Sequence, residues 1–140
     1  MRMWLDTEFN EFGGALISLA LAAENGEVWY ETLPCPRPGA WVAEHVIPVL
    51  GKPPEYQSEF KRKLSAFLCQ YPAVHIVADW PDDIRYFCEA VITGPGTRVK
   101  LPSLTFELRF DLPDTASVSA LPHNALADAI ALRDCMLGKE

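Results

Sequence analysis

The chain has 140 residues, a formal net charge of −7, and 49% hydrophobic against 22% charged residues. This length and composition are ordinary for a globular protein and predict a single domain, residues 1–140, with a full core. The acidic balance argues against a nucleic-acid partner, which usually meets a basic surface, unless several acids surround divalent cations.

The cysteines and the apolar runs indicate the compartment. The four cysteines are Cys35, Cys69, Cys88 and Cys135. None forms a Cys-x-x-Cys pair, so neither a zinc site nor a disulfide framework is indicated, and free thiols fit a reducing cytosol. The longest apolar run, residues 15–23, is too short to cross a bilayer. Because acids at positions 6 and 8 also argue against a signal peptide, we expect a cytoplasmic protein with no membrane partner.

Three strands open the chain. Residues 3–9, where apolar residues lead into Asp6 and Glu8, and the apolar residues 15–23 predict two strands separated by a turn. Asn25-Gly26 is typical of a two-residue hairpin turn, and residues 27–33 alternate as a partner strand would. We therefore expect an antiparallel meander.

Two helices follow a proline-rich loop at residues 34–39. Helical spacing of apolar residues predicts the first at 41–50, which Pro48 should end or kink. The second is predicted at 56–71 and ends before Pro72. Its apolar stripe consists of Phe60, Leu64, Phe67 and Leu68.

The second half of the chain alternates strands and helices. In order, we predict a buried central strand at 75–78, a helix at 81–92, a glycine-rich loop at 93–97, a strand at 104–112, an irregular stretch at 113–121 and a helix at 124–137. This order predicts an α/β fold: a mixed sheet with an antiparallel three-strand opening, then β-α-β-α, with helices flanking the sheet.

Acidic residues stand at the ends of three predicted elements. Asp6 and Glu8 are two apart in the first strand, so their side chains share one face. Two such acids repel unless they share a cation, hold a proton or are screened by water. The other stretches, 79–83 and 123–129, lie at helix starts, where α/β folds place their sites.

These motifs resemble those of the DEDD-type 3′–5′ exonucleases with a third-motif histidine. That ribonuclease H-like group contains oligoribonuclease, ribonuclease T and proofreading exonuclease subunits. Asp6-Thr7-Glu8 resembles the first motif, and His123 five residues before Asp128 resembles the third. In the second motif an Asn and an Asp are normally four apart. Here Asp79 takes the place of the Asn, and Asp83 is the motif aspartate. The short length and early meander are most similar to the small single-domain exoribonucleases.

The resemblance implies a two-metal hydrolysis of phosphodiester bonds. Asp6, Glu8 and Asp128 would hold one Mg²⁺ or Mn²⁺, and Asp6 would bridge to a second ion that Asp83 contacts through water. His123 would accept the proton of the attacking water. The implied partner is the 3′ end of a single strand, most readily RNA, cleaved to 5′-mononucleotides. The resemblance also favours a homodimer.

The resemblance also implies that Thr7, Phe9 and Asn10, near the first motif, are candidates for substrate binding, and Asp79 is a further candidate. Phe9 could stack on a terminal base or lie in the core, and Asp79 could strengthen ion binding or cap the helix that begins near Pro81. His45 and His75 are interpreted as structural because neither lies beside an acidic stretch.

Two other functions stay open. The chain could be a DNA 3′–5′ exonuclease of the proofreading or repair type, because the sequence does not show how the sugar is read. It could also be a nucleic-acid-binding domain of the same fold without turnover. The complete set of four acids and the histidine argues against the second.

Overall fold

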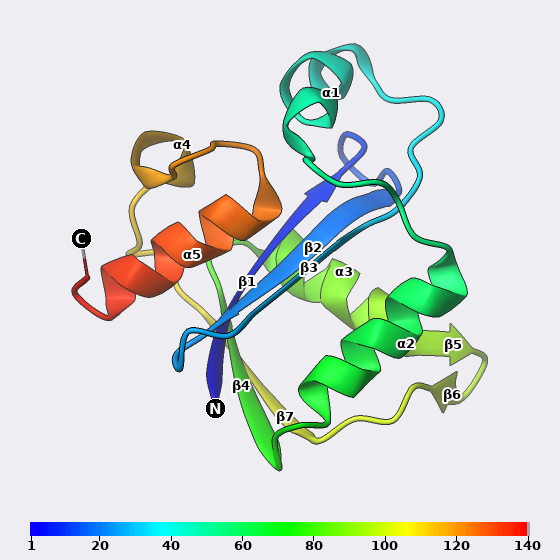
Figure 1. Cartoon of the computed structure of the whole chain (residues 1–140), viewed down its shortest axis with the longest axis vertical. Coiled ribbons are helices and arrows are strands. Elements are labelled where there is room, and N and C mark those ends of the chain that lie inside the picture. Colours follow the sequence, from blue (N-terminus) through cyan, green and yellow to red (C-terminus); the bar gives the residue numbers. More distant parts are fainter. Residues whose placement is uncertain (140) are drawn as a thin grey trace.

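The computed structural model describes residues 1–139, which form one five-stranded mixed sheet with helices on both faces (Figure 1). The strands are β1 (Arg2–Phe9), β2 (Leu16–Ala23), β3 (Val28–Thr32), β4 (Ala73–Ala78), β5 (Ile92–Gly94), β6 (Thr97–Arg98) and β7 (Ser103–Leu108). The helices are α1 (Ala40–His45), the 3-10 turn η1 (Ile47–Val49), α2 (Gln57–Leu68), α3 (Pro81–Val91), α4 (Thr115–Val118) and α5 (Ala125–Met136).

The sheet has the strand order β3-β2-β1-β4-β7. The predicted antiparallel meander is confirmed, since β1 pairs antiparallel with β2 and β2 with β3. On the other side β4 joins β1 in parallel, and β7 joins β4 in parallel. β4 is therefore an interior strand, as predicted, and its last residues lie beside the middle of β1, where Val77 pairs with Trp4.

Alternation along β1 divides the core into two layers. Met3 and Leu5 face α2 and α3, where they pack with buried side chains such as Phe60 and Phe87. Trp4 faces the opposite way and packs with Leu132 of α5. Because side chains alternate along a strand, Asp6 and Glu8 share the α5 face with Trp4, and Thr7 faces α3.

Three sequence predictions need correction. The segment 41–50 is not one helix: α1 ends at His45 and η1 follows, because Pro48 has no N–H to continue an α-helical ladder. The segment 93–97, predicted as a loop, contributes to the β5–β6 hairpin. The segment 113–121, predicted as irregular, contains α4, which the Asp114 side chain caps.

The other predicted helices and strands are present with shifts of boundary. The predicted stripe of α2 is buried. The last strand, β7, is shorter than the predicted 104–112. Within residues 1–139, no helix has both the length and the apolar character that crossing a membrane requires.

Candidate metal centre

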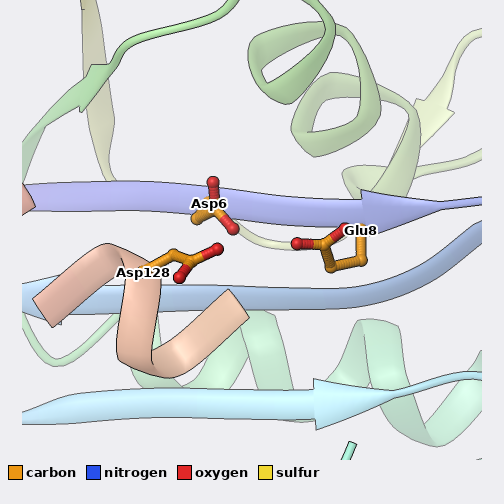
Figure 2. Close-up of side chains that lie close together, drawn as sticks. All are labelled: Asp6, Glu8 and Asp128. Carbon is orange, nitrogen blue, oxygen red and sulfur yellow. The ribbon is translucent and has the colours of Figure 1, made fainter. Parts of the chain in front are cut away.

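Three carboxylates meet between β1 and the start of α5. Asp6 and Glu8 project from β1 toward the first turn of α5, which carries Asp128 (Figure 2). The side chain of Asn124 caps this helix, accepting a hydrogen bond from the Ala127 N–H at 2.9 Å, and so fixes the turn that presents Asp128. One carboxylate oxygen from each of the three acids lies within 4.8 Å of the other two.

A second group of carboxylates shares Asp6 with the first. Asp79 directly follows β4, and Asp83 lies in the first turn of α3, which starts at Pro81. Oxygens of Asp6, Asp79 and Asp83 again lie within 4.8 Å of one another. The Thr7 hydroxyl donates a hydrogen bond to Oδ1 of Asp83 at 2.6 Å and holds that carboxylate in place. Asp6 thus belongs to both groups.

Three of these five acids are buried, and Glu8 and Asp79 are half-buried. Asp6, Asp83 and Asp128 are 8%, 4% and 3% exposed. Oδ2 of Asp6 and Oδ1 of Asp128 are buried and have no hydrogen-bond partner. Among residues 1–139, none of the acids in the two groups forms an ion pair with a lysine or arginine. Buried charges normally have a partner, and a cation bound by these acids would be one.

The electrostatics of the acids disfavour a fully ionised cluster. Burial, with the nearby charges of Asp83, Glu8 and Asp128, raises the pKa of Asp6 well above its usual range. Burial, with Asp128 and Asp83, raises the pKa of Glu8 to about 8. Burial raises the pKa of Asp83 to about 7, although the Thr7 hydroxyl opposes the rise. Without a cation, these acids hold protons at a pH where isolated carboxylates are ionised.

The donor set suits a hard divalent cation. Both groups offer only carboxylate oxygens, and Mg²⁺ and Mn²⁺ prefer oxygen ligands. The unpaired oxygens of Asp6 and Asp128 are free to act as ligands. The residues therefore fit divalent cations, and Asp6 is shared by the two groups.

His123 lies in the turn before α5 and is half-buried. Its backbone has a φ of 71°, an unusual value for a residue other than glycine. Its ring is 5.0 Å from that of Trp41 and 6.1 Å from that of His45, measured between ring centroids. The sequence interpretation of His45 as structural overlooks that its ring lies beside that of His123, the candidate general base. His75 instead contacts Thr105 and Glu107 of β7.

The predicted substrate residues fall into different roles. Thr7 orients Asp83. The Asn10 amide joins a loop to β1, accepting from the Gly39 N–H at 2.8 Å and donating to the Arg37 carbonyl at 3.0 Å. Phe9 is half-buried and stacks on Tyr86 with ring centroids 4.6 Å apart.

Asp79 does not cap α3, because the cap residue is Trp80 and makes no side-chain cap bond. Its other predicted role, in ion binding, agrees with its place in the second group.

Sequence reasoning missed an aromatic groove beside the first carboxylate group. The groove has a volume of about 380 Å³. It is lined by Glu8, Phe9, Glu11, Phe12, Trp41, Val42, Trp80 and Asp82. Trp41 and Trp80 are 51% and 57% exposed. The apolar spacing that predicts a helix at 41–50 includes Trp41. Only the packing of α1 in the fold shows that the Trp41 ring is exposed.

Comparison with protein-family models found no match, and comparison with curated proteins found none. The functional argument for this chain consequently rests on its own residues and on the resemblance of its motifs.

Proposed function

We propose that this chain is a metal-dependent 3′–5′ exonuclease that acts on single-stranded nucleic acid, RNA in preference to DNA, and releases 5′-mononucleotides. The observation that carries the proposal is the position of Asp6, which belongs to both carboxylate groups. Two-metal phosphodiester hydrolysis uses ions about 3.5–4 Å apart, which a shared carboxylate can join. The strand order β3-β2-β1-β4-β7, with the acids at carboxyl ends of strands and helix starts, agrees with a ribonuclease H-like fold.

Each acid has a distinct part in the proposed reaction. Bound Mg²⁺ or Mn²⁺ ions would supply an activated water and neutralise charge on the phosphate. Glu8 and Asp128 complete the first site with Asp6, and Asp79 and Asp83 complete the second. His123 accepts the proton of the attacking water at a ring nitrogen. Thr7 keeps the Asp83 carboxylate oriented through its hydroxyl.

The aromatic groove supports a single-stranded substrate. Glu8 belongs to both the first carboxylate group and the groove lining, so the groove leads directly to the proposed reaction centre. Unpaired bases stack on exposed aromatic rings with little regard for sequence. Phe9 is held by its stack on Tyr86, whose hydroxyl donates to the carbonyl of Gly14. The 3′–5′ polarity and the preference for RNA come from the resemblance in the sequence motifs.

The test is a shortening assay on 5′-labelled RNA and DNA oligomers, with and without a blocked 3′ end. We expect stepwise shortening of the unblocked RNA in Mn²⁺ or Mg²⁺, release of 5′-mononucleotides, and no reaction in EDTA. Asp128→Asn should abolish it, and Asp134→Asn, on the same helix but outside the carboxylate groups, should not. Faster shortening of DNA would favour the DNA exonuclease, and binding without shortening would favour a binding domain. Full activity in EDTA would refute the two-metal mechanism.

A further inference from the structure

The segment 34–50 is fixed against the site at both of its ends. Near its start, the Asn10 side chain bonds to the backbone of Arg37 and Gly39. At its end, the Asn124 side chain donates to the Val49 carbonyl at 2.9 Å, and the Tyr30 hydroxyl donates to the Leu50 carbonyl at 2.7 Å. Between these points, the buried Val42 and Val46 pack on Ile17 of β2. The segment is thus a rigid strap between β1 and the start of α5.

The strap presents a stacked pair of rings to His123. Trp41 and His45 of α1 lie nearly parallel, with centroids 4.4 Å apart and planes inclined by 18°. Nδ1 of His45 lies 2.9 Å from the Trp41 carbonyl oxygen. Since a carbonyl can only accept, Nδ1 carries a proton, and His45 is held by this hydrogen bond as well as by the stack. Both rings of the pair stand nearly perpendicular to the His123 ring, at 82° and 80°.

His123 contacts the rings of both Trp41 and His45. It precedes the helix in a turn, and its left-handed backbone is a conformation that persists only where the surroundings impose it. The next residue, Asn124, donates a hydrogen bond to the Val49 carbonyl of the strap, so the strap and the turn are joined next to this contact. Among residues 1–139, the groups whose side chains could share a metal ion contain neither His45 nor His123. A role for His45 as a metal ligand is therefore not indicated.

We propose that His45 is a positioning residue that acts through Trp41 to hold the imidazole of His123 in its working orientation. The inference rests on the proposed function, in which His123 is the general base. A general base contributes about 10²–10⁴-fold, and small displacements of a catalytic group reduce its contribution steeply. Loss of the His45 ring should therefore lower the chemical step by about tenfold, less than loss of His123 itself.

The kinetic test is a double-mutant cycle in which the chemical step is measured by single turnover with saturating enzyme and KM by steady-state kinetics. His45→Ala should slow the chemical step with little change in KM, and His45→Phe, which keeps a ring for the stack, should recover most of the rate. In a His123→Ala background, His45→Ala should have no further effect, because its target is gone. Glu44→Gln, an exposed neighbour on α1, is the matched control. An equal loss from His45→Ala in both backgrounds, or a rise in KM alone, would overturn the proposal.

A measurement without substrate separates this proposal from the proposed function. The ring carbon–proton signals of His123 should move in the NMR spectrum of His45→Ala, because an aromatic stack beside them is lost, and should stay close to wild type in Glu44→Gln. If the chain shortens no oligonucleotide but the His123 signals move, the exonuclease proposal fails and the contact stands. If the chain is active but the His123 signals do not move in His45→Ala and the coupled loss of rate is absent, the positioning role is wrong.

Discussion

Removing divalent cations should destabilise the folded chain at pH 7.5 far more than at pH 5.5. The reason is Glu8, whose pKa is raised from 4.5 to about 8 by burial and by Asp128 and Asp83. Between these two values the folded chain holds a proton on Glu8 that the unfolded chain has released. The contribution of Glu8 to the free energy of unfolding is therefore complete below its unfolded pKa of 4.5 and is lost as the pH rises toward 8.

The size of the effect follows from proton linkage. Each proton held only by the folded state changes the free energy of unfolding by about 1.4 kcal/mol per pH unit. Allowing for partial titration near pH 7.5, Glu8 alone gives a loss of about 2–3 kcal/mol between pH 5.5 and 7.5. For a domain of this size that is about 5–10 °C in Tm. Asp83, with its pKa raised to about 7, acts in the same direction.

Thermal unfolding followed by circular dichroism, in EDTA at constant ionic strength, measures the effect. Wild type should lose stability as the pH rises from 5.5 to 7.5, and Mn²⁺ should restore more of it at pH 7.5 than at pH 5.5. Glu8→Gln should show a shallower dependence because the titrating group is gone, and Asp134→Asn should behave as wild type. A metal-free stability that is flat or rises over this range, or a Glu8→Gln variant with the wild-type slope, would refute the reasoning.

Further substitutions separate the roles of the remaining site residues. Asp128→Ala should abolish turnover and, measured by thermal unfolding in EDTA, raise Tm, because a buried charge without a partner is removed. His123→Ala should slow single turnover by about 10²–10⁴-fold with Mn²⁺ affinity by calorimetry unchanged; a loss of affinity would show a misassigned role. Asp83→Asn should be severely impaired, and Asp79→Asn should retain activity but need more Mn²⁺; an inactive Asp79→Asn with an active Asp83→Asn would reverse the assignment. Thr7→Val should raise the pKa of Asp83 and shift Mn²⁺ binding in calorimetry to higher pH; an unchanged profile would contradict the orienting role.

Features that depend on local periodicity could be predicted from the sequence. The alternation of β1 placed Asp6 and Glu8 on one face, and the helical stripe identified the buried side of α2. The proline at the start of α3 correctly indicated where Asp83 lies relative to its helix. These are properties of neighbouring residues, so no tertiary information was needed.

Features that depend on docking between distant segments could not be predicted. The approach of His45 to His123 requires α1 to pack beside the start of α5, and nothing in either segment alone indicates it. Asn10 and Thr7 have partners more than twenty residues away, so their roles become visible only in the fold. The β5–β6 hairpin has too few residues per strand for an alternating pattern to emerge.

The most direct test of the central claim, that Asp6 joins two cation sites, is a count of bound Mn²⁺ by calorimetry together with electron paramagnetic resonance. Wild type should bind two Mn²⁺ per chain, and the two ions should show magnetic coupling, because one carboxylate lies between them. Asp6→Asn should lose the coupling and at least one ion, whereas Asp134→Asn should keep both. A single Mn²⁺ per chain in wild type, or two uncoupled ions that Asp6→Asn leaves in place, would contradict the account.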